Sequence, residues 1–200
     1  MKIRAGIIII FLLLVLKAGN LSAQSKVKLK VDSLPTALLV IDIQEFYFPE
    51  GGRLPLTNPQ ETSEKAAEVI KIFRDQKLPV IHIQHAGGSP IHKTVTPVPG
   101  EKLITKKEAN SFNGTDLLTY LKSLNIKRLV ICGMQTQMCV EATTRAAYDL
   151  GFKCIVVEDA CTTRNLKFEG RTIFEADVQA GAYALMNGYY ADVIPVAGLE

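Results

Sequence analysis

The stretch from Leu129 to Gly151 places the thiol of Cys139 where it could act as a nucleophile. It reads LVICGMQTQMCVEATTRAAYDLG, which predicts a short buried strand, a tight turn at Gly133 and a helix whose first turn carries Cys139. A thiol at a helix N-terminus faces the positive end of the helix dipole and free backbone N–H groups. We therefore expect a lowered pKa for Cys139, which favours the nucleophilic thiolate. The alternative is that Cys139 is a small buried packing residue.

Two further residues could complete a hydrolytic site with Cys139. Asp42 lies at the end of the apolar run 36–43, and Lys106 follows the short run 102–105. The carboxyl ends of parallel strands meet at one edge of a sheet, where ligands bind. A carboxylate there can take the thiol proton and pass it to a leaving group. A lysine beside both would favour both anions, and backbone N–H groups of the turn 133–139 could stabilise an oxyanion.

Each of these three residues also has a structural interpretation. Asp42 could cap a turn, Lys106 could be solvated together with Lys107, and Cys139 could fill space under its helix. Taken singly, the structural interpretation is at least as good for each residue. Because all three fall at predicted strand ends, the functional interpretation is favoured, and it predicts acyl transfer by a cysteine nucleophile.

Strands and helices alternate along the chain. We expect strands over 36–43, 78–84, 102–105, 128–132, 152–157 and 190–195, and helices over 59–76, 115–124, 139–151 and 170–186. Apolar strands of this kind are buried on both faces of a parallel sheet. The pattern therefore predicts an α/β fold with three layers and helices on both faces of the sheet. One domain, residues 36–200, is expected, preceded by an exposed Lys-rich leader, residues 24–35, with little structure.

The N-terminus has the features of a secretory signal peptide. Lys2 and Arg4 precede an apolar run over 6–16, and small residues follow up to Ala23. We expect residues 1–23 to direct export to the periplasm or the medium, with no stable membrane insertion after cleavage. The alternative is an uncleaved membrane anchor. Without Lys2, Arg4 and Lys17 the 23 basic residues become 20, against 20 acidic ones, so no nucleic-acid partner is expected.

The cysteines and histidines give no metal or redox motif. The chain has 4 cysteines but no CxxC pair, and we expect free thiols and no cofactor. His82 and His85 should face opposite sides of their strand, so they should not share a metal. We expect His85 to line a pocket and His82 to be a core residue with its hydrogen bonds satisfied. His92 lies in a predicted loop.

Several spaced motifs make the chain similar to a known superfamily. They are LLVIDIQ around Asp42, K-x-x-x-N-S-F from Lys106, G-x-x-T-x-x-C-V around Cys139, and VVEDACTT after it. Over residues 36–196 the chain resembles the isochorismatase-like cysteine hydrolases, which include nicotinamidases and N-carbamoylsarcosine amidases. The resemblance implies a Rossmann-like, six-stranded parallel sheet of order 3-2-1-4-5-6 and a homo-oligomer.

The same resemblance assigns roles within the site. It implies a catalytic triad of Asp42, Lys106 and Cys139, a cis peptide bond between Met134 and Gln135, and an oxyanion hole formed by the backbone N–H groups of Gln135 and Cys139. We also expect Tyr47, His85 and Phe112 to line the substrate pocket.

The chain departs from the superfamily pattern at three places. Tyr47 stands where the family usually has phenylalanine, which puts a hydroxyl in or near the pocket. His82 to His85 replaces the Asp-x-His metal motif of nicotinamidases. Gln179 occupies a position where many relatives have histidine.

We predict hydrolysis of a C–N bond in a small amide or carbamoyl compound through a thioester acyl-enzyme. One alternative is vinyl-ether cleavage as in isochorismatases, which do not need the cysteine, so Cys139 argues against it. The other is a non-catalytic protein of the same fold that binds a small molecule.

Overall fold

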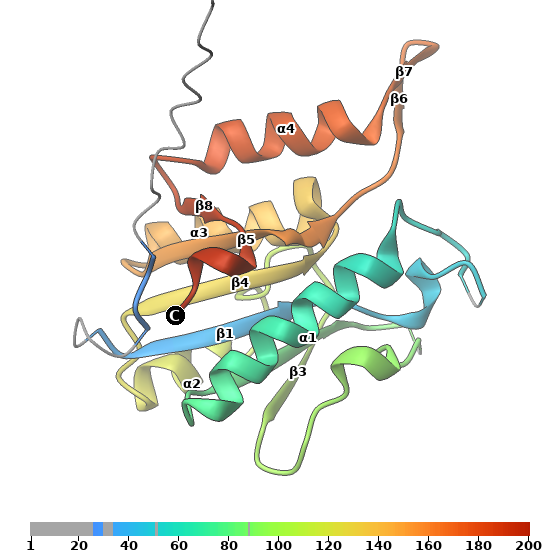
Figure 1. The fold of residues 1–200 in the computed structure, drawn as a ribbon. Coiled ribbons are helices and arrows are strands. Elements are labelled where there is room, and N and C mark those ends of the chain that lie inside the picture. The colour runs from blue at the N-terminus through green and yellow to red at the C-terminus, as the bar shows by residue number, and fades with distance from the viewer. Residues whose placement is uncertain (1–25, 30–33, 51, 88) are drawn as a thin grey trace, which may run out of the picture.

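The central sheet brings the carboxyl ends of distant segments to one edge. The computed structural model describes residues 26–29, 34–50, 52–87 and 89–200. Six parallel strands run in the order β3-β2-β1-β4-β5-β8 (Figure 1). Their bounds are β1 Thr36–Ile41, β2 Val80–His85, β3 Lys102–Lys106, β4 Arg128–Met134, β5 Lys153–Thr162 and β8 Asp192–Ile194. Because β8 is the sixth strand of this sheet, the expected order 3-2-1-4-5-6 is confirmed.

Helices cover the sheet on both faces, as the alternation of strands and helices predicted. The helices are α1 Pro59–Asp75, α2 Leu117–Ser123, α3 Glu141–Asp149 and α4 Glu175–Met186, with short 3-10 turns at Glu45–Tyr47, Lys93–Val95 and Val196–Gly198. Figure 1 shows α1 on one face of the sheet and α2 and α3 on the other. The α/β fold with three layers is therefore confirmed.

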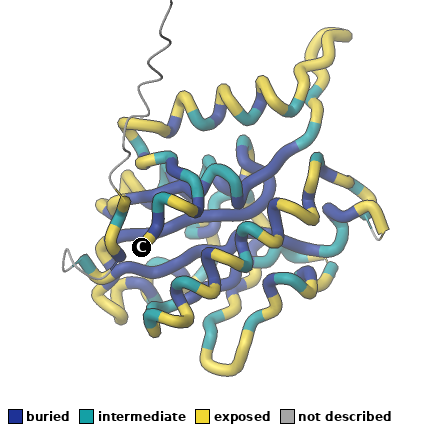
Figure 2. Tube along the Cα trace, in the orientation of Figure 1, coloured by how far each residue is buried: buried dark blue, intermediate teal, exposed yellow. Residues whose placement is uncertain are grey.

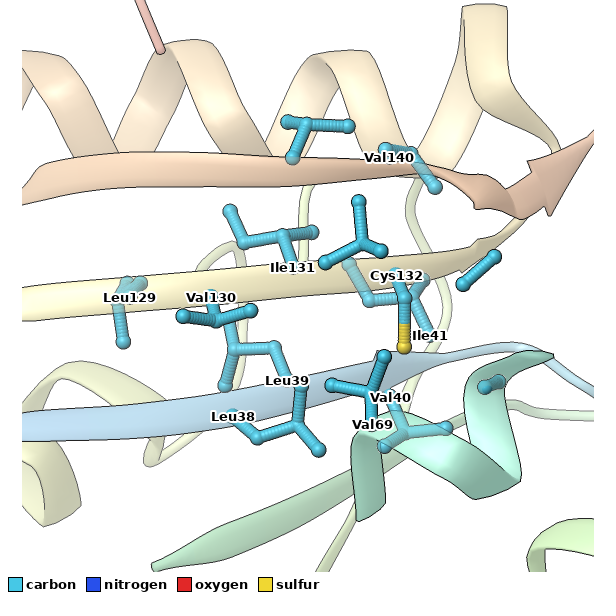
Figure 3. Packing of buried hydrophobic residues seen from close by; sticks show 14 of the residues in the cluster. Leu38, Leu39, Val40, Ile41, Val69, Leu129, Val130, Ile131, Cys132 and Val140 are labelled. Atoms are coloured by element: carbon cyan, nitrogen blue, oxygen red, sulfur yellow. The ribbon is translucent and has the colours of Figure 1, made fainter. Parts of the chain in front are cut away.

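The core lies on both faces of the central strands. Every residue of β1 and of β4 is buried, as expected for strands covered on both faces (Figure 2). Side chains of these two strands pack together with Val69 of α1 and Val140 (Figure 3). This packing fixes the ends of β1 and β4, where two of the candidate catalytic residues follow.

Gly133 allows β4 to approach β1 closely at the same edge. It pairs with Ile41 in the register of the two strands, and its φ of +133° is one that side chains other than glycine rarely adopt. A Cβ atom on Gly133 would lie 2.0 Å from the carbonyl oxygen of Ile41. A glycine is therefore required where β4 passes the residue that precedes Asp42.

Most boundaries differ from the expected ones by one or two residues, and two differ by five. β5 continues to Thr162 instead of ending near residue 157, and the helix expected from residue 170 begins at Glu175. Between them β6 (Leu166–Phe168) and β7 (Arg171–Ile173) form an antiparallel hairpin. Its turn residues Glu169 and Gly170 have φ of 47° and 76°, as type I′ hairpin turns require. The Glu-Gly pair is thus a turn and not part of a helix.

Residues 26–29, which belong to the expected leader, pair with the C-terminal end of the chain. The Val27 N–H donates to Gly198 O at 2.8 Å, and the Leu29 N–H donates to Glu200 O at 2.9 Å. Leu29 is also buried. The predicted signal peptide, residues 1–23, lies outside the described residues. Among the residues that are described, no helix is long and apolar enough to cross a membrane.

Candidate active site

Asp42, Lys106 and Cys139 meet at the carboxyl edge of the sheet. Asp42 follows β1, Lys106 is the last residue of β3, and Cys139 lies in a π-helical turn, Thr136–Val140, between β4 and α3. Lys106 Nζ lies 2.6 Å from Asp42 Oδ2 and 3.3 Å from Cys139 Sγ. All three residues are at most 5% exposed. The structure therefore brings together the three residues that the sequence singled out.

Lys106 fixes the other two groups in place. Its ammonium forms an ion pair with Asp42 Oδ2 and also donates to Glu108 O at 3.1 Å. Neither carboxylate oxygen of Asp42 has a hydrogen-bond partner among the residues described in the structure. The neighbouring thiol of Cys139 interacts with this carboxylate and is the donor that remains for it. This arrangement suits transfer of the thiol proton to Asp42.

The pKa of Cys139 is raised, and the expected lowering is wrong. Burial raises this pKa to about 12, the negative charge of Asp42 adds to the increase, and Lys106 opposes it. The sequence could place Cys139 at a helix start but could not reveal how deeply it is buried. Burial also raises the pKa of Asp42, against the lowering effect of Lys106. A thiol beside a carboxylate of raised basicity points to general-base activation and not to a preformed thiolate.

We expect Cys139 to react slowly with iodoacetamide at pH 7.5, at least about 10-fold more slowly than a free thiol, because little thiolate is present. Asp42→Asn should speed this reaction, since it removes the charge that raises the Cys139 pKa and leaves Lys106 in place. Peptide mapping by mass spectrometry would follow each cysteine separately. Fast labelling of wild-type Cys139, or slower labelling in Asp42→Asn, would contradict this account of the thiol.

The turn before Cys139 belongs to a buried polar network. The Met134–Gln135 peptide bond is cis, as the resemblance implied. The Gln135 side-chain amide donates to the Tyr47 hydroxyl at 3.5 Å and accepts from Gln137 at 3.3 Å. Gln137 in turn accepts from the Thr163 hydroxyl. Tyr47, whose pKa is raised by burial, therefore contacts the side chain of one residue of the expected oxyanion hole.

Two glutamines that were not predicted as site residues link the segments around the site by hydrogen bonds. The Gln44 amide donates to His85 O and Ser89 O and accepts from the His85 N–H at 2.7 Å, so it ties the end of β1 to the end of β2. Gln179 of α4 accepts from the Thr136 hydroxyl at 2.9 Å and donates to Cys161 O at 2.7 Å. Gln44 stands within the LLVIDIQ motif, which could have indicated it. For Gln179 the only indication in the sequence was its departure from the family pattern.

Two cavities lie around His85, and neither is lined by a residue of the candidate triad. One of 160 Å³ is lined by Phe46, Arg53, His85, Ala86, Gly87 and Ser89, and one of 360 Å³ shares the last four of these residues. His85 thus lines a cavity as expected. Neither lining includes Tyr47 or Phe112. The Phe112 ring lies 6.1 Å from that of Phe152, which precedes the amino end of β5, and its place in the substrate pocket stays a prediction.

The other histidines have structural partners. His82 is buried, as expected, and its Nε2 lies 2.8 Å from Glu101 Oε2. Its Nδ1 has no hydrogen-bond partner among the described residues, so the expectation that its hydrogen bonds are satisfied is wrong for this nitrogen. Burial lowers the pKa of His82. His92 shares a hydrogen with the Thr94 hydroxyl and stacks on Phe48 with ring centroids 3.7 Å apart. All 4 cysteines are buried free thiols, as expected. Within the described ranges, no group of three or more His, Cys, Asp or Glu side chains could hold a metal ion.

Glu101 should contribute stability that is lost in acid. Burial would raise its pKa, but hydrogen bonds from Arg74, Val98 and His82 lower it to about 2 from 4.5. A lowered folded-state pKa stabilises the fold above pH 4.5, and this contribution disappears as the pH falls toward 2. We expect Glu101→Gln to reduce the free energy of unfolding at pH 7 by at most about 3 kcal/mol.

Urea unfolding at several pH values would measure this effect. The difference between wild type and Glu101→Gln should shrink between pH 4.5 and pH 2. A difference that stays constant across this range would contradict the proposed role of the ionised carboxylate.

Comparison with known proteins identifies the family of the chain and agrees with its fold. Residues 36–196 match the family described as Isochorismatase domain. The chain belongs to the isochorismatase family. It is 41% identical over 173 residues to the isochorismatase family protein YddQ of Bacillus subtilis, with 80% of this chain and 96% of YddQ covered. An isochorismatase structure from Pseudomonas putida has a TM-score of 0.79 at 31% identity, covering 83% of this chain and 90% of that one.

One relative whose name states an activity is less similar in sequence than YddQ. The ureidoacrylate amidohydrolase RutB of Cronobacter sakazakii is 27% identical over 170 residues, which cover 62% of this chain and 73% of RutB. These relationships identify the chain as an isochorismatase-family hydrolase.

Proposed function

We propose that this isochorismatase-family protein is a cysteine amidohydrolase that cleaves a C–N bond in a small amide or carbamoyl compound. The observation that carries the proposal is the buried contact of Lys106 Nζ with both Asp42, at 2.6 Å, and Cys139, at 3.3 Å. A nucleophile, a base and a fixed cation are the parts that acyl transfer needs. The activity named for RutB is of the same kind and supports this choice.

In the acylation step, Asp42 removes the thiol proton while Cys139 Sγ attacks the carbonyl carbon. The backbone N–H groups of Gln135 and Cys139 donate to the resulting oxyanion. When the C–N bond breaks, Asp42 returns the proton to the leaving nitrogen. A thioester and ammonia, or an amine, result.

In the second step, Asp42 removes a proton from a water molecule, which attacks the thioester. The C–S bond breaks, the acid product forms, and the thiolate takes its proton back from Asp42. The Lys106 ammonium stabilises the anions that form on either neighbour. Tyr47 positions the turn before Cys139, and Gln44 positions the ends of β1 and β2. Neither residue takes part in proton transfer.

Ammonia release across a panel of small amides and carbamoyl compounds tests this function. We expect turnover of at least one compound, unchanged by a chelator and absent in Cys139→Ala. Turnover that persists in Cys139→Ala would contradict the mechanism. Release of pyruvate from isochorismate with no amide turnover would favour the vinyl-ether reaction.

Export and self-association remain proposals. We propose that residues 1–23 direct export, which detection of the chain in culture medium or periplasm would test. We also propose a homo-oligomer, since Phe168, Phe174 and Tyr189 are at least 60% exposed on the hairpin and around α4. A monomeric mass by light scattering would contradict it.

A further inference from the structure

The Tyr47 hydroxyl lies at the end of a chain of hydrogen bonds that all run in one direction. The Thr163 hydroxyl donates to Gln137 Oε1, and Gln137 Nε2 donates to Gln135 Oε1 at 3.3 Å. Gln135 Nε2 then donates to the Tyr47 oxygen at 3.5 Å. Each side chain thus gives a hydrogen to the next one, and Tyr47 receives the last of these bonds.

This direction leaves the hydrogen of the Tyr47 hydroxyl available for another group. In the described part of the chain the hydroxyl accepts from Gln135 and donates to no residue. Tyr47 is only 5% exposed, and a buried donor without an acceptor is costly. By contrast, the Tyr183 hydroxyl accepts from Gln179 and donates to Glu158 O at 2.6 Å. A ligand that supplies an acceptor explains the free donor of Tyr47.

The surroundings of the Tyr47 phenol connect it to the reacting groups. Burial raises its pKa, and the negative charges of Asp42 and Cys139 raise it further, so the phenol keeps its hydrogen at neutral pH. On one side it contacts Gln135, which belongs to the expected oxyanion hole. On the other side the centroid of its ring lies 4.0 Å from that of Phe46, which lines the cavity of 160 Å³. Tyr47 therefore links the catalytic turn to this cavity.

We propose that the Tyr47 hydroxyl donates a hydrogen bond to a second carbonyl oxygen of the substrate, so that the substrate is an amide whose acyl part carries this neutral acceptor. A neutral acceptor is favoured because the Asp42 carboxylate already places negative charge near the phenol. A site with a fixed donor rejects analogues without the acceptor, since the donor is then left unpaired. This inference rests on the proposed amidohydrolase function and names its substrate class. Tyr47 would be a specificity-determining residue, and the proton transfers would stay with Asp42.

Pairs of neutral amides that differ only in the acceptor test the proposal. Pyruvamide, acetoacetamide and 4-oxopentanamide would be compared with propanamide, butanamide and pentanamide, in which a methylene group replaces the ketone. We expect the full-length wild type to prefer at least one keto amide in kcat/KM. Tyr47→Phe removes only the hydroxyl. It should lower kcat/KM for that keto amide by about 10-fold, mainly through KM, and leave its alkyl partner within a factor of about 2.

The change in this preference on substitution is the decisive quantity, because a ketone also activates a neighbouring amide carbonyl. Tyr120→Phe is the matched control, since Tyr120 lies in α2, outside the site, and should behave like the wild type. Tyr47→Phe should keep its Tm within about 2 °C of the wild type, because the hydroxyl forms only one long hydrogen bond. Equal losses on both members of every pair in Tyr47→Phe would overturn the proposal, since Tyr47 would then act on the reacting carbonyl or on the fold.

A binding experiment separates this proposal from the catalytic one. NMR titration of Cys139→Ala would measure the affinity for the six amides without turnover, with Tyr47→Phe added in the same background. A preference for a keto amide that disappears with the hydroxyl supports the proposal even if no amide is hydrolysed. Equal affinity within all three pairs, or a preference unchanged by Tyr47→Phe, would overturn it even if amides are hydrolysed.

Discussion

Cys139→Ala is expected to reduce kcat for the best amide substrate by at least about 10⁴-fold, because it removes the attacking atom. Asp42→Asn should have a loss of similar order, since the buried thiol, with its pKa near 12, then lacks its base. The double variant should be little worse than either single one, because the two groups act in one step. Steady-state ammonia release would measure all three.

Cys154→Ala is the matched control for this experiment. Cys154 is as buried as Cys139 and burial also raises its pKa to about 12, but it lies at the amino end of β5. Its removal should leave kcat close to that of the wild type. Comparable losses in Cys139→Ala and Cys154→Ala would mean that the loss reflects damage to the fold.

Gly133→Ala is expected to reduce the free energy of unfolding by several kcal/mol, among the larger effects of single substitutions. The new methyl group would meet the Ile41 carbonyl oxygen at 2.0 Å, and alanine would have to adopt a φ of +133°. Since neither β1 nor β4 can move without disturbing the core, the ends of both strands should shift. Activity should fall as well, because Asp42 follows Ile41 directly. Urea unfolding followed by circular dichroism would measure the change.

Gly181→Ala is the control for this substitution. Gly181 is exposed in α4, and a Cβ atom there would meet nothing within 4 Å. Replacing a helical glycine by alanine should raise the free energy of unfolding by up to about 1 kcal/mol. Similar stabilities of Gly133→Ala and wild type would contradict the close approach of β1 and β4.

The sequence predicted the strands and the convergence of Asp42, Lys106 and Cys139 because both depend on local patterns, whereas the strand order was implied by the family resemblance. Apolar runs mark buried strands, and Asp42, Lys106 and Cys139 each stand at the end or just after the end of such a run. The parallel topology then brings these ends together whatever their distance along the chain. The hairpin 166–173 was missed because its strands are only 3 residues long and their outward side chains give no amphipathic pattern.

The electrostatics of the site could not be predicted in the same way. A helix start suggested a lowered pKa for Cys139, but the result depends on burial by distant segments and on the charge of Asp42. The positioning roles of Gln44 and Gln179 also depend on remote partners. Gln44 reaches residues 41 and 45 positions away, and Gln179 reaches Thr136, which is 43 positions away. Such contacts leave no periodic signal in a single sequence.

Trapping of the thioester on Cys139 tests the central claim most directly. The purified chain would hydrolyse its best amide substrate with and without hydroxylamine, and both products and protein masses would be followed. The mechanism predicts hydroxamate formation at the expense of the acid, none of it in Cys139→Ala, and an acyl adduct confined to the Cys139 peptide when the reaction is quenched early. Undiminished acid formation without hydroxamate or adduct, or an adduct on another cysteine, would contradict it.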